Sequence, residues 1–359
     1  MVFAPLGLVK KNCLGIDIGS SAIKIVELSR LGERIKLDAY GEMKAEAVYQ
    51  KPFRTFEKNT LLFQTMDIAR AIRGVIDEAK MASKKAVFSI PDFSTFYTTF
   101  ELPPMSSQEL PQAVRFQARQ QIPVPLNEVS LDWAVIEGET IDHQGSALKI
   151  LLVAVPNEII LQYQEISRIC KLELYALEAE VFGFLRSANP EKRKSVILID
   201  IGAQSTTCSL VENGVLKQSR SFEPAGNEIG EVLSKALQIE FKEAERLKEK
   251  HGILPSPEPG KENVREIILT ILDAILNEAG KTIQDFSFGQ NKNPEQVILA
   301  GGAALIPGLR EYFAQTLKKE VQIVNPFLNT FYPPILEKTL KIIGPSYAIA
   351  VGSAMRGLE

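Results

Sequence analysis

The chain has 359 residues, of which 45% are hydrophobic and 24% are charged, and its formal net charge is −3. This composition is typical of a soluble globular protein that is long enough for two domains or one duplicated domain. The balanced charge excludes a nucleic-acid binder that relies on excess Lys and Arg, and no apolar run reaches the roughly 18 residues of a membrane-spanning helix.

The cysteines and the N-terminus indicate the cellular compartment. The three cysteines show no C-x-x-C pair, which argues against a disulfide framework and against a structural zinc site. The first charged residues, Lys10 and Lys11, follow the apolar N-terminal stretch, whereas a secretory signal carries its positive charge first. We therefore expect a cytoplasmic protein.

The first predicted unit is a meander of three strands over residues 13–40. Its first strand ends in Asp-Ile-Gly, and a turn of small residues leads into the second strand. Such a turn exposes backbone N–H groups that can cradle phosphate oxygens, and glycine lets the backbone approach closely. An aspartate at the strand end is placed to hold a hydrated Mg²⁺. The candidate residues are Asp17, Gly19, Ser20 and Ser21, with Lys24 adding a charge-assisted contact.

Residues 84–155 hold four strand patterns around a single helix pattern, which predicts a small α/β insert. The insert is rich in aromatic residues, and a small sheet buries one face, so Phe88 and Phe100 are predicted to lie in its core. The remaining aromatic residues flank a turn and could instead line a groove toward the first lobe, where an extended peptide would bind. These residues are Phe93, Phe96 and Tyr97.

A second meander over residues 195–222 repeats the first. Its first strand again ends in Asp-Ile-Gly, and Asn213-Gly214 is a strong signal for a type I′ hairpin turn. The two Asp-Ile-Gly motifs lie about half a chain apart, which predicts two related halves whose turns face each other around a di- or triphosphate. A lone turn would be an ordinary hairpin. The candidate residues of the second turn are Asp200, Gly202, Ala203, Ser205 and Thr206.

Two weaker signals lie further along the second half. The backbone of Gly301, Gly302 and Ala303, which follow a short buried strand, could pack against a nucleobase, although an ordinary strand-to-helix turn has the same pattern. Glu245 and Lys248 share one face of a predicted charged helix. They could hydrogen-bond ribose hydroxyls, although a solvated, salt-bridged face is the usual interpretation. The P-loop and G-x-G-x-x-G motifs are both absent.

Together these motifs resemble those of the actin/Hsp70/hexokinase ATPase superfamily. Within it, the chain is most similar to the PilM family of type IV pilus assembly proteins, which are relatives of the cell-division protein FtsA. The similarity covers nearly the whole chain. Its most specific part is Ile-Pro-Val-Pro-Leu-Asn-Glu-Val at 122–129, which generic ATPases of this fold lack. The other matching stretches are residues 15–28, 200–203 and 300–308.

The resemblance implies an α/β protein with a duplicated actin-like (ribonuclease H-like) ATPase fold and an FtsA-like 1C insert subdomain. The first lobe, 1A, would comprise residues 1–83 and 156–194, with the insert at 84–155. The second lobe, 2A and 2B, would comprise residues 195–359, with 2B at about 227–290.

The resemblance also implies ATP and Mg²⁺ in the cleft between the lobes, with Asp17 and Asp200 as metal ligands. The family's water-orienting residue fits Glu180 best, with Glu178 as the second choice. After the second meander the family usually has Phe-Gly-Gly, whereas this chain has the single glycine Gly226 for a backbone contact with the nucleotide. Any ATPase activity is expected to be weak.

The resemblance further implies a cytoplasmic scaffold that binds the cytoplasmic N-terminal segment of the inner-membrane protein PilN in a groove between 1A and 1C. The protein would then lie at the inner membrane through its partner, and other pilus proteins or a second copy are further candidate partners. Two alternatives stay open, a filament-forming FtsA-like divisome protein and a small-molecule kinase of the same superfold. FtsA ends in a linker and an amphipathic helix, and a kinase needs a general-base aspartate and usually a longer chain. This sequence shows neither pattern.

Overall fold

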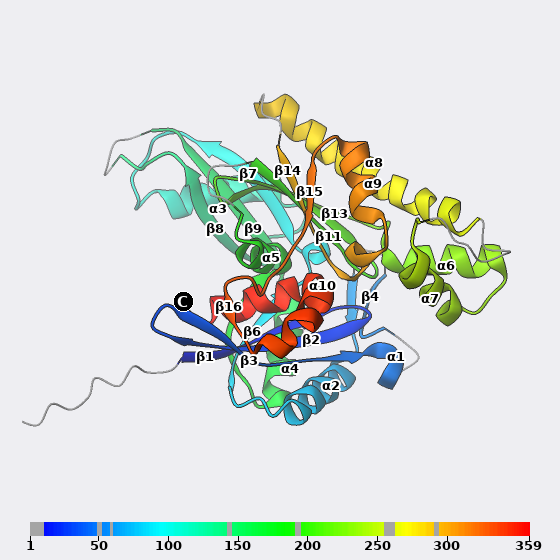
Figure 1. Cartoon of the computed structure of the whole chain (residues 1–359). Helices are drawn as coiled ribbons and strands as arrows, with labels where there is room; N and C mark the ends of the chain where they lie inside the picture. Colours follow the sequence, from blue (N-terminus) through cyan, green and yellow to red (C-terminus); the bar gives the residue numbers. More distant parts are fainter. Residues whose placement is uncertain are drawn as a thin grey trace, which may run out of the picture.

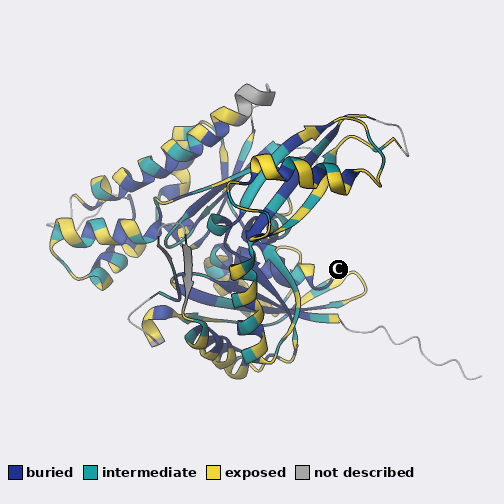
Figure 2. Ribbon diagram, turned by 180° about the vertical axis from the view of Figure 1, so that it is seen from behind, coloured by how far each residue is buried: buried dark blue, intermediate teal, exposed yellow. Residues whose placement is uncertain are grey.

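The computed structural model describes residues 11–48, 52–57, 60–141, 146–190, 195–254, 263–290 and 294–359. These residues form two lobes, each built on one large β-sheet, together with two smaller sheets of three and two strands (Figure 1). Buried residues concentrate in the strands of the large sheets, and exposed residues lie on the outer faces of the surrounding helices (Figure 2).

Both large sheets begin with the predicted meander, so the internal duplication is confirmed. In each half the second strand pairs antiparallel with the first and the third. Asn213 and Gly214 have φ values of 55° and 76°, the positive values that a type I′ turn requires. The strands are β1 (Lys11–Ile18), β2 (Ala22–Leu31) and β3 (Arg34–Lys44) in the first half, and β11 (Ser195–Ile201), β12 (Thr206–Glu212) and β13 (Val215–Phe222) in the second.

Further strands extend each meander into a mixed sheet. They are β6 (Lys85–Ile90), β10 (Glu173–Ala179) and β16 (Thr330–Phe331) in the first sheet, and β14 (Gln296–Ala300) and β15 (Glu320–Ile323) in the second. The strand orders are β10-β6-β1-β2-β3-β16 and β13-β12-β11-β14-β15. Because β6 runs parallel to β1 and β14 runs parallel to β11, the carboxyl ends of each pair meet at one sheet edge. The two Asp-Ile-Gly turns lie at these edges.

Two helices, α5 (Glu180–Ala188) and α10 (Glu337–Arg356), pack against each other between the two large sheets (Figure 1). The helices α2 (Thr65–Glu78) and α4 (Asn157–Cys170) cover the outer face of the first sheet. The outer face of the second sheet is covered by α6 (Gly226–Leu237), α7 (Phe241–His251), α8 (Val264–Gln290) and α9 (Leu309–Leu317). The shorter elements are α1 (Ala45–Val48), β4 (Arg54–Glu57), β5 (Thr60–Phe63), η1 (Asp92–Ser94), η2 (Gly302–Leu305) and η3 (Pro334–Leu336). Within the described ranges, no helix is both long enough and apolar enough to cross a bilayer.

The insert is a three-stranded antiparallel sheet covered by one helix. Its elements are β7 (Phe96–Leu102), α3 (Leu110–Gln121), β8 (Val129–Glu137) and β9 (Leu148–Pro156), and its strand order is β7-β9-β8. Phe100 lies in its core, as predicted, and Phe96 packs against the same core. Tyr97 lies on the opposite face, with its ring 6.5 Å from that of Phe182 in α5. Both Phe96 and Tyr97 are half-buried by these contacts, and a peptide groove between the insert and the first lobe stays a prediction.

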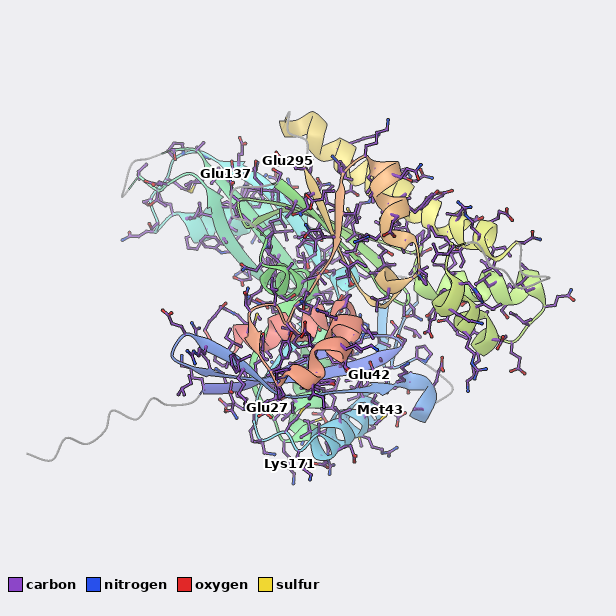
Figure 3. All side chains as sticks on the ribbon, viewed as in Figure 1. Glu27, Glu42, Met43, Glu137, Lys171 and Glu295 are labelled. Atoms are coloured by element: carbon purple, nitrogen blue, oxygen red, sulfur yellow. The ribbon has the colours of Figure 1, made fainter. Side chains whose placement is uncertain are left out.

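The insert contacts the second lobe as well as the first. Glu137, labelled in Figure 3, lies at the end of β8. Its carboxylate forms an ion pair with Lys217 of β13. The Lys217 side chain is 5% exposed, so its charge depends on this carboxylate for compensation. Apolar residues of β9 also pack against β11 and β12 of the second sheet. The insert is thus fixed to both lobes.

The insert begins later than the sequence indicated. The segment 84–90 was expected to belong to it, but β6 pairs with β1 and is a central strand of the first sheet. Phe88 is accordingly buried in the first lobe, where its ring lies 6.0 Å from that of Tyr163. A short apolar run such as β6 is typical of a parallel strand buried on both faces, but its sequence does not indicate which strand it pairs with.

The end of the chain also departs from the expected division. The range 195–359 was assigned to the second lobe, but β16 pairs with β3, and α10 packs on β1, β2 and β6. Small residues permit this packing, because an added Cβ at Gly15 would lie 1.9 Å from the carbonyl oxygen of Ala350. A Cβ at Gly352 would similarly lie 1.8 Å from the carbonyl oxygen of Gly183 in α5. The small-residue pattern of the last helix therefore marks close packing against the first lobe.

Candidate functional site

The first glycine turn is a tight hairpin that connects β1 to β2. The Gly19 N–H donates to the carbonyl of Ala22 at 3.0 Å, and an added Cβ on Gly19 would lie 2.8 Å from the same oxygen. The carbonyls of Ser20 and Ser21 accept hydrogen bonds from chain segments that follow β3, at 3.1 and 2.8 Å. The buried Asp17 carboxylate accepts from Ser89 Oγ of β6 at 2.9 Å. The turn is therefore held from two sides.

The second glycine turn has the same local geometry. The Gly202 N–H donates to the carbonyl of Ser205 at 3.0 Å, and a Cβ on Gly202 would lie 2.8 Å from that oxygen. Here the turn carbonyls accept from the first N–H groups of α6, with Gly226 donating to Gly202 at 2.9 Å. A Cβ at Gly226 would lie 3.0 Å from the Gly202 oxygen, so this close approach favours glycine. Thr206 is fully buried on the face of β12 that carries Cys208 and Leu210, and its Oγ1 donates to the Pro224 carbonyl.

Asp17 and Asp200 lie on the sheet faces that point toward each other. Side chains alternate along a strand, and the neighbours of Asp17, Ile16 and Ile18, face the outer helices α2 and α4. Asp17 therefore points into the layer that holds α5 and α10. The apolar residues on either side of Asp200 likewise face the outer helices of the second lobe. The two aspartates thus approach the same layer from opposite lobes.

The charges of this layer act on one another. The pKa of Asp200 is raised to about 7, first by loss of hydration and then by the carboxylates of Glu180 and Asp17, while the Lys24 ammonium opposes the shift. Four of the predicted residues are therefore brought together from different parts of the chain. They are Asp17, Lys24, Glu180 and Asp200.

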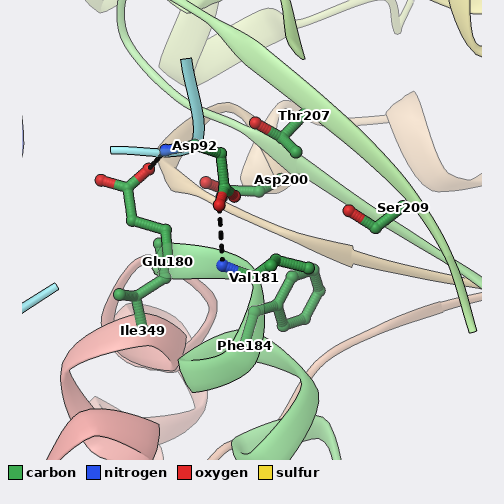
Figure 4. Close-up of a pocket in the computed structure, with 8 residues that line it drawn as sticks. All are labelled: Asp92, Glu180, Val181, Phe184, Asp200, Thr207, Ser209 and Ile349. Carbon is green, nitrogen blue, oxygen red and sulfur yellow. Dashed lines mark hydrogen bonds between the residues drawn. The ribbon is translucent and has the colours of Figure 1, made fainter. Parts of the chain in front are cut away.

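Glu180 is the first residue of α5 and is buried at the centre of this layer. Its Oε1 accepts from the Arg54 guanidinium at 2.8 Å, and its Oε2 accepts from the Asp92 N–H at 3.3 Å (Figure 4). Burial raises the pKa of Glu180, and the positive charge of Arg54 opposes that shift. Glu178 instead accepts two hydrogen bonds of 2.7 Å from Arg186. Of the two candidate glutamates, Glu180 is the one that shares the layer with the aspartates.

Two charged residues of this site, Arg54 and Asp92, were not among those predicted from the sequence. Arg54 begins β4, and its buried guanidinium forms an ion pair of 2.8 Å with Glu180. Asp92 lies in η1, directly after the carboxyl end of β6, and burial followed by the charge of Glu180 raises its pKa well above the ordinary value. A polar residue at that strand end was a usable signal, because it lies beside β1 at the same sheet edge.

A narrow pocket lies between η1, the helices α5 and α10, and the second sheet. Figure 4 shows Asp92 and Glu180 on one side of it, and Asp200 with two hydroxyl residues of β12 on the other. The lining residues are Asp92, Glu180, Val181, Phe184, Asp200, Thr207, Ser209 and Ile349. Three carboxylates and two hydroxyl groups therefore line this pocket, together with apolar side chains of α5 and α10.

The Gly301 turn lies directly beside Asp200. Gly301 has φ of 88°, and an added Cβ would lie 2.6 Å from Asp200 Oδ1, so a larger residue is excluded twice over. Its N–H donates to the carbonyl of Pro345 in α10 at 3.0 Å. Gly302 is exposed with open space where a Cβ would stand, and Ala303 is buried against Gly226. The backbone at Gly302 is thus accessible at the edge of the second turn.

Glu245 and Lys248 join the same edge from α7. Lys248 Nζ donates to both carboxylate oxygens of Glu245 at 2.6 and 2.7 Å and to the Gly226 carbonyl at 3.0 Å. Lys248 is buried, so the interpretation as a solvated, salt-bridged face is wrong for this residue. Burial raises the pKa of Glu245, and Lys248 opposes the shift. The pair therefore braces the start of α6 beside the second turn.

Two duplicated lobes that enclose α5 and α10, with matching glycine hairpins at facing sheet edges, define the duplicated actin-like (ribonuclease H-like) α/β fold with an FtsA-like insert. The sequence profile of the family described as type IV pilus assembly protein PilM matches residues 15–358, and the chain belongs to this family. Both the fold class and the family predicted from the motifs are confirmed.

Known relatives agree with this assignment. The chain is 25% identical to a protein solved in a PilM-PilN type IV pilus biogenesis complex, with a TM-score of 0.82 over 97% of this chain and 98% of the other. It is 27% identical over 208 residues to the cell division protein FtsA of Bacillus subtilis, a match that spans 53% of this chain and 45% of FtsA. MreB 5 of Spiroplasma citri, solved with AMPPNP, shares the fold at 14% identity, with a TM-score of 0.52 over 92% of this chain and 97% of that protein.

Proposed function

We propose that this protein is an ATP-binding scaffold of type IV pilus assembly, which acts at the cytoplasmic face of the inner membrane by binding the N-terminal segment of a PilN-like protein. The observation that carries the proposal is the similarity over 97% of the chain to a protein solved in complex with PilN. Membership of the PilM family favours this function over a divisome protein or a kinase.

The two glycine turns are the proposed phosphate cradle. Their N–H groups and small side chains come from facing sheet edges, so a nucleotide between them would contact both lobes. Gly301, Gly302 and Ala303 would border the adenine, and Glu245 and Lys248 would border the ribose. MreB 5, which shares this fold, was solved with AMPPNP bound. In this proposal, nucleotide binding fixes the angle between the lobes.

Asp17 and Asp200 suit a Mg²⁺ ion that is carried by the phosphates. Within the described ranges, no cluster of three or more His, Cys, Asp or Glu residues is arranged to hold a metal alone. Nucleotide-bound Mg²⁺ takes one or two protein carboxylates and completes its shell with water and phosphate oxygens. The ion would offset the negative charge that a triphosphate brings into this acidic layer. Glu180 is the residue we assign to orienting water if the nucleotide is hydrolysed.

For the partner, we propose an extended peptide docked between the first lobe and the insert. Extended peptides gain main-chain hydrogen bonds along a strand edge and place alternate side chains in pockets. The insert is the part of the chain that is added to the duplicated lobes. It contacts both of them. Its position would therefore respond to the angle between them.

Thermal unfolding tests the nucleotide part. A ligand at 100 times its Kd stabilises the native state by about 2.7 kcal/mol, so Mg-ATP should raise the melting temperature measurably. Asp17→Ala and Asp200→Ala should each lose the Mg²⁺-dependent part of this rise, and Asp67→Ala on the surface of α2 serves as the control. If both variants keep the full rise, the cradle assignment is wrong.

A fluorescence-anisotropy titration tests the partner part. A labelled peptide that copies the cytoplasmic N-terminal segment of a PilN protein should bind the full-length protein in the presence of Mg-ATP, and a scrambled peptide should not. Equal binding of the two peptides, or no binding of either, contradicts the proposed scaffold.

A further inference from the structure

Asp92 stands at the point where the chain leaves the first sheet and enters the insert. It follows β6 by two residues and opens η1, which leads directly into β7. The residue is 5% exposed although it carries a carboxylate. Buried carboxylates need hydrogen-bond partners, and the partners of Asp92 come from distant parts of the chain.

Asp92 and Glu180 cap each other's helical segments. The first N–H groups of a helix lack partners within the helix, and the residue before α5, Ala179, has no side chain that could accept from them. Asp92 Oδ1 takes this role by accepting from the Val181 N–H at 3.2 Å. In return, Glu180 Oε2 accepts from the Asp92 N–H at 3.3 Å (Figure 4). The arrangement has the reciprocity of a capping box, but it joins two distant segments.

A third arm connects this pair to the insert sheet. The Tyr97 hydroxyl on β7 donates to the same Asp92 Oδ1, and the Tyr97 ring packs edge-on against Phe182 of α5. Both η1 and β7 also contact β13 of the second lobe. A shift of Asp92 would therefore move the first strand of the insert.

Glu180 connects the same pair to the glycine turns. Its other oxygen, Oε1, accepts from Arg54, and the residue before Arg54 donates its N–H to the carbonyl of Ser20 in the first turn. One oxygen of the Glu180 carboxylate thus holds Arg54, whose segment is fixed to the first glycine turn. The other oxygen holds the Asp92 N–H, where the chain enters the insert. Any reorientation of this carboxylate must break its hydrogen bond to Arg54 or its hydrogen bond to the Asp92 N–H.

We infer that Asp92 is a positioning residue that couples the orientation of Glu180 to the insert, so that a nucleotide between the lobes loosens the η1–β7 connection when it draws Glu180 away from the Asp92 N–H. The inference rests on the proposed nucleotide site. It adds to that site a mechanical link whose parts are Glu180, Asp92 and Tyr97. The predicted consequence is an insert whose mobility depends on the nucleotide.

Amide hydrogen exchange of the full-length protein, read by mass spectrometry over residues 92–102, tests the link. Saturating Mg-ATP should speed exchange there about fivefold, the factor expected for one lost hydrogen bond. Tyr97→Phe removes the hydroxyl but keeps the ring on Phe182. In this variant the faster exchange should remain at Asp92 but no longer extend into β7, residues 96–102, while the Kd for Mg-ATP stays within twofold of wild type. Mg-ATP-dependent exchange in β7 that persists in Tyr97→Phe, or wild-type protein that binds Mg-ATP without a change over residues 92–102, overturns the inference.

A second arm needs no nucleotide and separates this inference from the proposed function. In Glu180→Gln the amide oxygen should face Arg54, which turns the NH₂ group toward the Asp92 N–H and breaks that bond. Exchange over residues 92–102 should then rise about fivefold without ligand. The matched control is Glu178→Gln, whose carboxylate pairs with Arg186. If Mg-ATP does not bind wild type, the nucleotide proposal fails, and the link itself stands or falls on Glu180→Gln alone. Unchanged exchange in that variant overturns it.

Discussion

Replacing Arg54 with methionine should destabilise the protein strongly, because it leaves the Glu180 carboxylate buried without its cation. The side chains of Arg54 and Glu180 are 7% and 9% exposed, and the distance from the guanidinium nitrogen to the carboxylate oxygen is 2.8 Å. Removing one partner of a buried ion pair typically costs about 3–5 kcal/mol, since the remaining charge has lost both its hydration and its counter-ion. We expect Arg54→Met to lower the free energy of unfolding by about this amount.

A matched control separates burial from the loss of an ion pair as such. Lys341 and Glu337 form a pair of 2.7 Å, but their side chains are 61% and 55% exposed. Exposed pairs contribute about 1 kcal/mol or less, so Lys341→Met should change stability only slightly. The double variant Arg54→Met/Glu180→Gln removes both buried charges and should regain part of the stability that Arg54→Met loses.

Urea unfolding followed by circular dichroism gives the free energies of wild type and the three variants. We expect Arg54→Met to lose the most free energy of unfolding and the double variant to lie between it and wild type. Two results would refute it. One is a loss in Arg54→Met no larger than in Lys341→Met, and the other is a double variant no more stable than Arg54→Met.

Two further predictions concern the carboxylates of the site. Glu180→Gln should keep Mg-ATP affinity but reduce any steady-state phosphate release, while Glu178→Gln should leave it unchanged; equal rates in wild type and Glu180→Gln would remove Glu180 from the chemistry. Asp92→Asn should alter the pH dependence of unfolding. Folding raises the pKa of Asp92, so above about pH 4 the unfolded chain releases this proton first, and wild type should lose stability relative to the variant as pH rises. Parallel stability curves for the two proteins, measured by urea unfolding between pH 4 and 8, would contradict this.

The sequence revealed the duplication because both meanders are local structures. Each is set by the alternation of its strands, a turn of small residues and, in the second copy, Asn213-Gly214. The elements that were misassigned are those whose place depends on a distant neighbour. The sequence of β6 is apolar and does not indicate which strand it pairs with. The small residues of α10 predict a closely packed helix but do not indicate which sheet it covers. Excising residues 84–155 to remove the insert would therefore also remove a central strand, and a clean excision must begin at β7.

The candidate site divides in the same way. The glycine turns and their aspartates could be predicted from the sequence, because the backbone at Gly19, Gly202 and Gly301 needs glycine for local reasons. The choice of Glu180 over Glu178 came from family resemblance, and the structure now gives it a physical basis in the separate partner of Glu178. Asp92 was not singled out in the sequence, because its role as a cap for α5 depends on a segment 89 residues away.

Arg54 and Asp92 change how the role of Glu180 should be understood. A carboxylate that only faced a nucleotide would be free to adopt whatever orientation the ligand required. Glu180 is instead bound at both oxygens by residues from two other segments, 126 and 88 residues away. Its orientation toward any ligand is therefore set by competition with Arg54 and Asp92, and each of these connects to a different part of the molecule. A substitution at Glu180 that removes both contacts consequently acts on the glycine turn and on the insert together. Only comparison with Tyr97→Phe and Arg54→Met can separate its local effect on a nucleotide from its effect on the insert.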